Sequence, residues 1–328
     1  MTQPKTATPR SARLIASAQR RLDDKLEFQN APPLKKLRQA LDRLSDPSVD
    51  EIFDLAIPSM RDVSWMSEYL AKWLEDFLEN HYYLAPLTEG RQPFSGSEFM
   101  SFLPIFKHPM LIISAHNIGP EYGKRSESAQ DVVVGFGGQP SASIVVSGGS
   151  VTYGLWRVGV PISRTTDLNA DLACEADGEL TLAPGQGELR VDRKRTSAVV
   201  SRVSGAACLL HFSTPVGALP FSVGFHTLEK RVVRIVPSSR RASRAMVIIE
   251  ALRNLGGVEY HEALEACLQH EAFFVRWPAM RELVRLKGVD ALADLEKFIA
   301  AEDSPSALRA GINVRSYLQA RMLEHEHG

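Results

Sequence analysis

The order in which two kinds of hydrophobic pattern follow each other constrains this chain more than any other feature. Apolar residues recur at helical spacing before Met110, then form short runs divided by turn residues, and return to helical spacing after Pro237. Helical spacing predicts amphipathic helices, and short apolar or alternating runs predict strands. The sequence therefore predicts an α+β multidomain protein with helices at both ends and an antiparallel β domain between them.

The composition is that of an ordinary folded protein. The chain has 328 residues, of which 44% are hydrophobic and 23% charged, and its formal net charge is −1. A near-zero charge gives no global field that would attract nucleic acid or an anionic membrane. The three cysteines Cys174, Cys208 and Cys267 lie too far apart in sequence for a typical zinc site or redox pair, and no apolar run approaches the roughly 20 residues that span a bilayer. We therefore expect a cytoplasmic protein with no membrane contact.

Residues 1–22 carry five basic residues and no acidic one, interleaved with Ser, Thr, Ala and Pro. Such an arm could contact phosphate groups, and it also resembles an organellar transit peptide. Pro4 and Pro9 discourage helix formation, and little apolar surface is offered for packing. We favour a flexible, solvated arm over residues 1–32. We expect no nucleic-acid partner, because the rest of the chain supplies no basic face or aromatic platform.

Residues 33–97 are predicted to form a helical segment. Leucines at positions 34, 37, 41 and 44 recur at helical spacing, and a longer apolar stripe follows Asp62, a plausible N-cap residue. Trp65 and Trp73 belong to this second helix. They could form a platform for a ligand, but aromatic residues near an apolar stripe are more often core residues, which is the interpretation we favour.

Residues 98–237 are predicted to form a jelly-roll-like β domain. Eleven short runs with strand character are separated by turn residues such as Gly137-Gly138, Gly148-Gly149, Asp177-Gly178 and Pro184-Gly185. The runs are 110–115, 131–136, 143–146, 151–158, 170–176, 179–183, 188–191, 198–203, 207–212, 221–225 and 231–236. Their near-regular spacing is typical of an antiparallel sandwich or jelly roll.

The segment from Asp177 to Gln186, read as a strand, a Pro-Gly turn and a second strand, resembles the cupin jelly-roll family. The resemblance implies a metal held by an H-x-H pair, a nearby Glu and a later His. The β region has no H-x-H, so the candidate metal ligands are His116, Glu121, His211 and His226, a set that suits Fe, Mn, Ni or Zn. The competing interpretation makes His211 a core residue with a satisfied ring nitrogen and leaves His116 and His226 in loops.

Other candidate ligand-binding residues of the β domain are Tyr153, Arg157 and Arg202. A basic cluster of Arg190, Arg193, Lys194 and Arg195 crowds a turn, where it could grip an anionic ligand or simply form a solvated hairpin tip, and we favour the solvated tip. The segment Gly135–Gly138 looks like a phosphate-binding loop, but a strand follows where a helix N-terminus should receive the phosphate. We interpret it as a hairpin turn.

Residues 238–328 are predicted to form five short helices joined by tight turns, at about 239–255, 259–269, 274–286, 290–300 and 306–322. The stretch 270–283, with its Val275-Arg276 pair, resembles a HEAT repeat, and residues 304–310 echo it about 33 residues later, as stacked helical pairs do. A HEAT-like surface implies a protein partner, and a short array can equally be a structural support. The sequence does not distinguish these two roles.

The combination resembles bacterial proteins that join a cupin-like domain to HEAT-like helices. We favour a cytoplasmic binding or scaffold protein, in which the β domain recognises a small molecule or peptide and the helical domain docks a protein partner. The alternative is a metal-dependent cupin-type oxygenase, in which the metal would bind dioxygen or polarise the substrate at an open coordination position. An enzyme needs its histidines to converge on one cavity, whereas a scaffold allows them to scatter.

Overall fold

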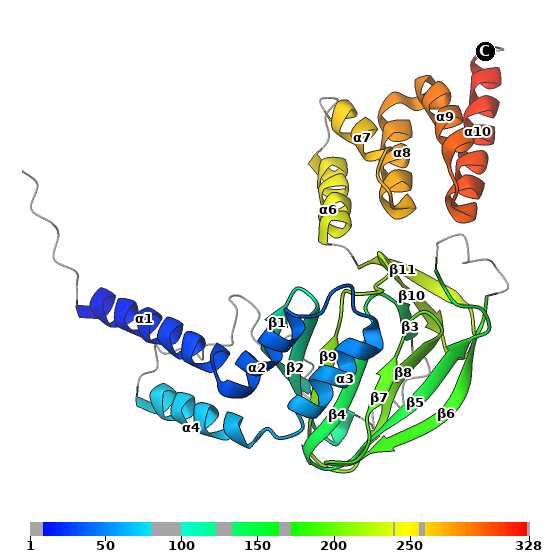
Figure 1. Cartoon of the computed structure of the whole chain (residues 1–328). Helices are drawn as coiled ribbons and strands as arrows, with labels where there is room; N and C mark the ends of the chain where they lie inside the picture. Colours follow the sequence, from blue (N-terminus) through cyan, green and yellow to red (C-terminus); the bar gives the residue numbers. More distant parts are fainter. Residues whose placement is uncertain are drawn as a thin grey trace, which may run out of the picture.

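The computed structural model describes residues 9–79, 100–122, 133–163, 172–238, 240–255 and 260–326. Helices lie at both ends of the chain and strands lie between them, as Figure 1 shows. This arrangement confirms the predicted α+β class with antiparallel sheets in the middle.

Within the described residues, four helices precede the first strand. They are α1 (Pro9–Gln29), α2 (Pro32–Leu41), α3 (Val49–Ser59) and α4 (Ser64–Glu79). A capping box starts α3: Ser48 Oγ accepts a hydrogen bond from the Glu51 amide, and the Glu51 carboxylate accepts one from the Ser48 amide. Asp62, the predicted N-cap residue, lies two residues before α4, where its Oδ1 accepts a hydrogen bond from the amide of Ser64, the first residue of the helix, at 2.9 Å.

The prediction of a flexible arm over residues 1–32 is wrong from Pro9 onward, and residues 1–8 lie outside the described part of the chain. Proline is tolerated at the first position of a helix, where its missing N–H would have no partner. The helix α1 lies beside α4 (Figure 1), where Phe28 is fully buried against Trp73. Lys72 of α4 also pairs with Asp24 of α1. The prediction that Trp73 is a core residue is confirmed, since only 4% of it is exposed.

Eleven strands are present in the described residues. They are β1 (Met100–His108), β2 (Leu111–Ile118), β3 (Val133–Gly137), β4 (Ser141–Gly148), β5 (Val151–Val158), β6 (Cys174–Leu182), β7 (Leu189–Val191), β8 (Thr196–Val203), β9 (Ala207–Ser213), β10 (Phe221–His226) and β11 (Val232–Pro237). They form a five-stranded sheet in the order β1-β2-β9-β4-β7 and two three-stranded sheets in the orders β11-β10-β3 and β6-β5-β8. All recorded strand pairs are antiparallel.

Three details of the predicted strands are wrong. The runs predicted at 170–176 and 179–183 both contribute to one strand, β6 (Cys174–Leu182), because Asp177 and Gly178 form a bulge opposite β5 rather than a turn; residues 170 and 171 lie outside the described part of the chain. The strand β1 was not predicted; it contains Pro104, which is accommodated at the edge of the sheet beside a bulge. The turn at Gly137-Gly138 is not a hairpin, since β3 pairs with β10 while β4 pairs with β9 and β7.

The five-stranded sheet uses its two faces differently. On β9, Leu210 and Phe212 pack in one hydrophobic cluster with residues of α2 and α3, which cover this face of the sheet (Figure 1). The alternate residues Leu209 and His211 point to the other face, because successive side chains of a strand alternate. That second face is turned toward the sheet β6-β5-β8, and it carries the site described below.

The C-terminal helices are α6 (Arg240–Leu255), α7 (His261–Cys267), α8 (Phe273–Lys287), the short 3-10 helix η2 (Gly288–Ala291), α9 (Leu292–Ala301) and α10 (Pro305–Glu326). All five predicted C-terminal helices are present. Their buried residues form one cluster with apolar residues of β3 and β10, including Phe136 and Phe225, so the helices pack on the β domain. Across the described helices, none is long and apolar enough to cross a membrane.

Candidate functional site

A cavity of about 310 Å³ lies between the five-stranded sheet and the sheet β6-β5-β8. We call it the β-domain pocket. Its polar wall is made by His116 of β2, Ser143 of β4, Tyr153 of β5, Arg193 of the β7–β8 turn and His211 of β9. The rest of its lining is mostly aliphatic, with Leu189, Val191, Val200 and Leu209 among the residues that contribute. Apolar walls with a few convergent polar groups are characteristic of small-molecule sites.

Two histidines meet on one wall of the β-domain pocket. The rings of His116 and His211 lie edge to face with their centroids 5.6 Å apart. The Nε2 atom of His116 is 2.8 Å from Ser114 Oγ, and the Nδ1 atom of His211 is 3.1 Å from Ser143 Oγ. Ser114 thus holds the His116 ring and Ser143 holds the His211 ring, and the two histidines lie on the neighbouring antiparallel strands β2 and β9.

Both imidazoles are neutral near pH 7. Burial lowers the pKa of His211 to about 3, with further contributions from the positive charge that His116 and Arg193 would place beside it. Burial also lowers the pKa of His116. Each ring therefore offers one N–H donor and one lone pair rather than a charge.

Tyr153 continues the polar wall from the opposite sheet. Its hydroxyl is hydrogen-bonded to Ser143, and burial raises the pKa of Tyr153 to about 12 against the smaller opposing effect of that bond. The phenol is therefore protonated at neutral pH and can act as a hydrogen-bond donor. Together with His211, it makes Ser143 the centre of a network that joins the two sheets.

Arg193 enters the β-domain pocket from a tightly fixed turn. Asp192 Oδ1 accepts hydrogen bonds from the amides of Lys194, Arg195 and Thr196, at 2.9 to 3.1 Å, and from the Thr196 hydroxyl. The backbone of Arg193 has a φ of +63°, in the left-handed region that residues other than glycine rarely adopt. The turn thus directs the Arg193 side chain to the pocket instead of out into solvent, where the solvated-tip interpretation placed it.

The guanidinium of Arg193 retains unused donors. Its Nη1 donates to the Gly135 carbonyl oxygen and to Ser197 Oγ, both at 3.2 Å. In the described residues no acceptor is recorded for Nε or Nη2, and no carboxylate forms an ion pair with this side chain. No aspartate or glutamate lines the pocket within that part of the chain. Arg193 is therefore a pocket cation for which the described part of the chain supplies no counter-charge.

Of the seven site residues predicted from sequence, three line the β-domain pocket: His116, His211 and Tyr153. Glu121 follows β2 with an exposed side chain, and His226 ends β10, where its Nδ1 accepts from the Glu229 amide.

Arg157 and Arg202 do not line the pocket either. Arg157 is 55% exposed and pairs with Asp177, and Arg202 is 61% exposed and pairs with Glu179. Both partners belong to β6, so Arg157 of β5 makes a surface ion pair with the neighbouring strand and Arg202 of β8 makes one that spans β5.

The four predicted metal ligands do not assemble. The described residues contain no group of three or more His, Cys, Asp or Glu side chains placed to hold a metal ion. Catalytic zinc sites use three protein ligands, and here two imidazoles stand near a guanidinium with no carboxylate on the same wall. The residues present do not fit the metal centre that the cupin resemblance implies.

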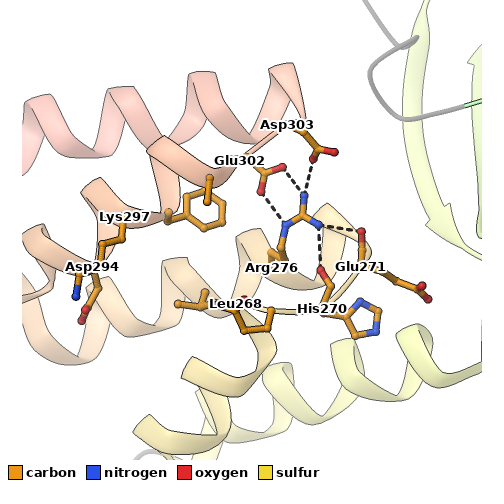
Figure 2. Close-up of a pocket in the computed structure, with 11 residues that line it drawn as sticks. Leu268, His270, Glu271, Arg276, Asp294, Lys297, Glu302 and Asp303 are labelled. Atoms are coloured by element: carbon orange, nitrogen blue, oxygen red, sulfur yellow. Dashed lines mark hydrogen bonds and ion pairs between the residues drawn. The ribbon is translucent and has the colours of Figure 1, made fainter.

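A second concavity, of about 530 Å³, lies in the C-terminal helices. We call it the helical-domain groove. Leu268, Phe298 and Ala301 give it an apolar part, and charged residues such as Asp294, Lys297 and Asp303 surround that part (Figure 2).

Arg276, at one end of the groove, is fully engaged by the protein. It makes two hydrogen bonds to the Glu302 carboxylate, a third to Asp303, and two more to the carbonyl oxygens of His270 and Glu271 (Figure 2). An arginine has five N–H donors, so this one has none left for a ligand. Arg276 therefore joins α8 to the segment after α9 and is a structural residue. It differs in this from Arg193, whose Nε and Nη2 have no acceptor among the described residues.

Some pocket residues were missed or interpreted differently from the sequence. Ser143 carries no sequence signal beyond its place on an alternating strand. Arg193 was named within a basic cluster, but four basic residues near one turn do not reveal which of them faces inward. Arg190, from the same cluster, instead pairs with Asp54 and Glu188.

No protein-family model matches this chain, and no curated protein matches it. Solved structures with some similarity include a cupin superfamily protein from Desulfitobacterium hafniense, with 13% identity over 38% of this chain and 82% of that one, and a TM-score of 0.21. KdgF from Halomonas sp. shows 11% identity over 36% and 81%, with a TM-score of 0.21. The polyketide cyclase RemF from Streptomyces resistomycificus shows 9% identity over 45% and 77%, with a TM-score of 0.23. Similarity at this level assigns neither a family nor an activity.

Proposed function

We propose that this protein is a cytoplasmic binding or scaffold protein, whose cupin-like β domain holds a small organic ligand and whose HEAT-like C-terminal helices dock a protein partner. The observation that carries the ligand-binding part is the convergence of polar groups from five separate chain segments on the β-domain pocket. These groups are neutral hydrogen-bonding side chains plus one arginine, and they lie within apolar walls. Apolar walls with a few polar groups that fix the orientation of a bound molecule are characteristic of small-molecule sites.

The test is a ligand-observed NMR screen of small fragments against the intact protein and against Ala198→Phe. Ala198 lines the β-domain pocket, and a phenyl ring at this position fills part of its volume. We expect fragments that bind the wild-type protein to lose their saturation-transfer signal with the variant. Fragments that bind both proteins equally, or a screen without any binder, would contradict the proposed ligand site.

The docking part of the proposal is supported by the helical-domain groove, whose apolar part is bordered by charges of both signs. A photo-crosslinking residue at Ala301, which lines the groove, tests it against one at Ala293, which is exposed on the same helix outside the groove. We expect a specific partner to crosslink from position 301 only. Equal crosslinking from both positions would contradict the proposal that the partner binds at the groove.

The competing function is a metal-dependent oxygenase. The observation in its favour is the close approach of two neutral imidazoles, His116 and His211, since neutral histidine is the form that binds metals. The nearby Arg193 guanidinium opposes it, because a fixed positive charge disfavours a bound cation. Metal analysis by plasma mass spectrometry separates the two: near-stoichiometric Fe, Mn, Ni or Zn that falls in His211→Ala would favour the enzyme.

A further inference from the structure

The ligand class for the β-domain pocket can be narrowed further, on the basis of the proposed binding function. Arg193 indicates the class of ligand. Burying a charged group costs free energy unless an opposite charge or hydrogen bonds compensate for the lost water. Its Nη1 atom is compensated by Gly135 and Ser197, while Nε and Nη2 have no acceptor in the described part of the chain. These two atoms form the edge of a guanidinium that can bind two oxygens of one acid group.

We propose that the β-domain pocket receives an organic anion, a carboxylate or a phosphate, whose charged group lies against the Nε and Nη2 atoms of Arg193. The anion supplies the counter-charge that the described residues do not provide around this side chain.

The remaining pocket groups agree with an anionic ligand. The two histidines are neutral, and the hydroxyls of Ser141, Ser143 and Tyr153 can donate hydrogen bonds to further oxygens. No carboxylate of the described chain lines the pocket to repel an anion. At about 310 Å³ the cavity is near the lower limit for ligand sites, which favours a compact molecule.

The backbone around Arg193 is built to hold the side chain in place. The turn is fixed by Asp192, and the carbonyl oxygens of residues 193, 194 and 195 accept hydrogen bonds from the amides of Gly137, Ile162 and Val158. Three separate segments thus hold this turn. A position preorganised in this way lowers the entropy cost of binding an anion.

The experiment compares benzoate with benzamide, two probes that share a skeleton and differ in charge. Inorganic phosphate serves as a second anion. Each probe is titrated by NMR into the wild-type protein, Arg193→Gln, Arg193→Lys and the control Arg202→Gln. Arg202 is an exposed arginine that pairs with Glu179 outside the pocket. Circular dichroism and thermal unfolding confirm that each variant is folded.

We expect benzoate or phosphate to bind the wild-type protein and Arg202→Gln equally, and benzamide to bind more weakly. We expect the affinity of the anion to fall about tenfold or more in Arg193→Gln, as for the loss of charge-assisted hydrogen bonds, and less in Arg193→Lys, which keeps the charge. If Arg193→Gln does not fold, Arg193→Lys alone decides the question through its weakened but measurable binding.

Two outcomes overturn the inference in different ways. Equal binding of benzoate and benzamide, unaffected by Arg193→Gln but abolished by Ala198→Phe, would leave a ligand site that does not select anions. Absence of binding by both anions and by the uncharged fragments would overturn the inference together with the proposed function.

Discussion

His116 and His211 lie edge to face on neighbouring strands β2 and β9, with 5.6 Å between their ring centroids. Each ring is anchored by a serine, and the Arg193 guanidinium lies close enough to influence the charge of His211. A proton added to His211 would therefore meet both a buried environment and neighbouring positive charge, and one added to His116 would meet a buried environment. The pair is a neutral wall of the pocket at physiological pH.

Stability should therefore depend on pH through His211. Its pKa is about 3 in the folded protein and close to the ordinary 6.5 when unfolded, so between these values the unfolded state binds more protons. The free energy of unfolding should fall as pH drops from 6.5 toward 3, by at most about 1.4 kcal/mol per pH unit from this residue. Urea denaturation across that range should show a shallower slope for His211→Gln. Equal slopes for the two proteins would contradict the burial of a neutral His211.

Removing the hydroxyl of Tyr153 should weaken ligand binding without disrupting the fold. Tyr153→Phe keeps the ring in the core but removes the bond to Ser143, which should cost about 1 kcal/mol of stability. Thermal unfolding and the affinity for benzoate are the measurements. Tyr69→Phe, on the helical pair α1–α4, is the matched control and should leave the affinity unchanged. If Tyr69→Phe also lowers the affinity for benzoate, or if Tyr153→Phe does not lower it, the Tyr153 hydroxyl does not contribute to ligand binding.

The Arg276–Glu302 ion pair should be one of the main stabilising contacts of the C-terminal helices. Glu302 has no exposed side-chain surface and Arg276 is 15% exposed, so Arg276→Ala leaves a buried carboxylate without its partner. The expected loss is about 3–5 kcal/mol, whereas Arg202→Ala, which breaks an exposed pair, should cost less than about 1 kcal/mol. Chemical denaturation measures both, and comparable losses would show that burial of Glu302 does not matter.

Two glycines with positive φ should respond differently to alanine. At Gly148, with φ +83°, a Cβ atom would lie 2.2 Å from the Ala206 carbonyl oxygen. At Gly178, with φ +98°, no atom lies within 4 Å of the added carbon. Gly178→Ala should therefore cost about 1–2 kcal/mol from backbone strain alone, and Gly148→Ala clearly more. The two melting temperatures test this, and equal losses would contradict the close approach at Gly148.

The sequence predicted the fold to the extent that short-range patterns determine it. The strands β5 and β9 and the helix α8 lie within one residue of the predicted runs 151–158, 207–212 and 274–286, because each is an apolar-rich segment with turn residues close to its ends. The bulge at Asp177-Gly178 was taken for a turn, since a glycine after an aspartate has the same local signal in both. The strand β1 was missed because Pro104 argues against a strand everywhere except at an edge or a bulge.

The candidate site was predictable only in part. His116, His211 and Tyr153 stand out as residue types, and their strands bring them together. The role of Arg193 depends on a φ of +63° and on a turn held by Asp192, which no spacing rule reveals. The same limit explains why Arg157 and Arg202, both candidate ligand-binding residues in the sequence, are exposed and pair with carboxylates of β6.

The most direct measurement for the proposed site is the methyl NMR spectrum of the protein during a titration with benzoate. Val191, Val199 and Val200 line the β-domain pocket, and Leu268 lines the helical-domain groove, so their methyl signals report on the two places separately. The proposal predicts saturable shifts of the three valine signals, with Leu268 unchanged. Shifts confined to Leu268, or valine signals that do not move, would contradict it.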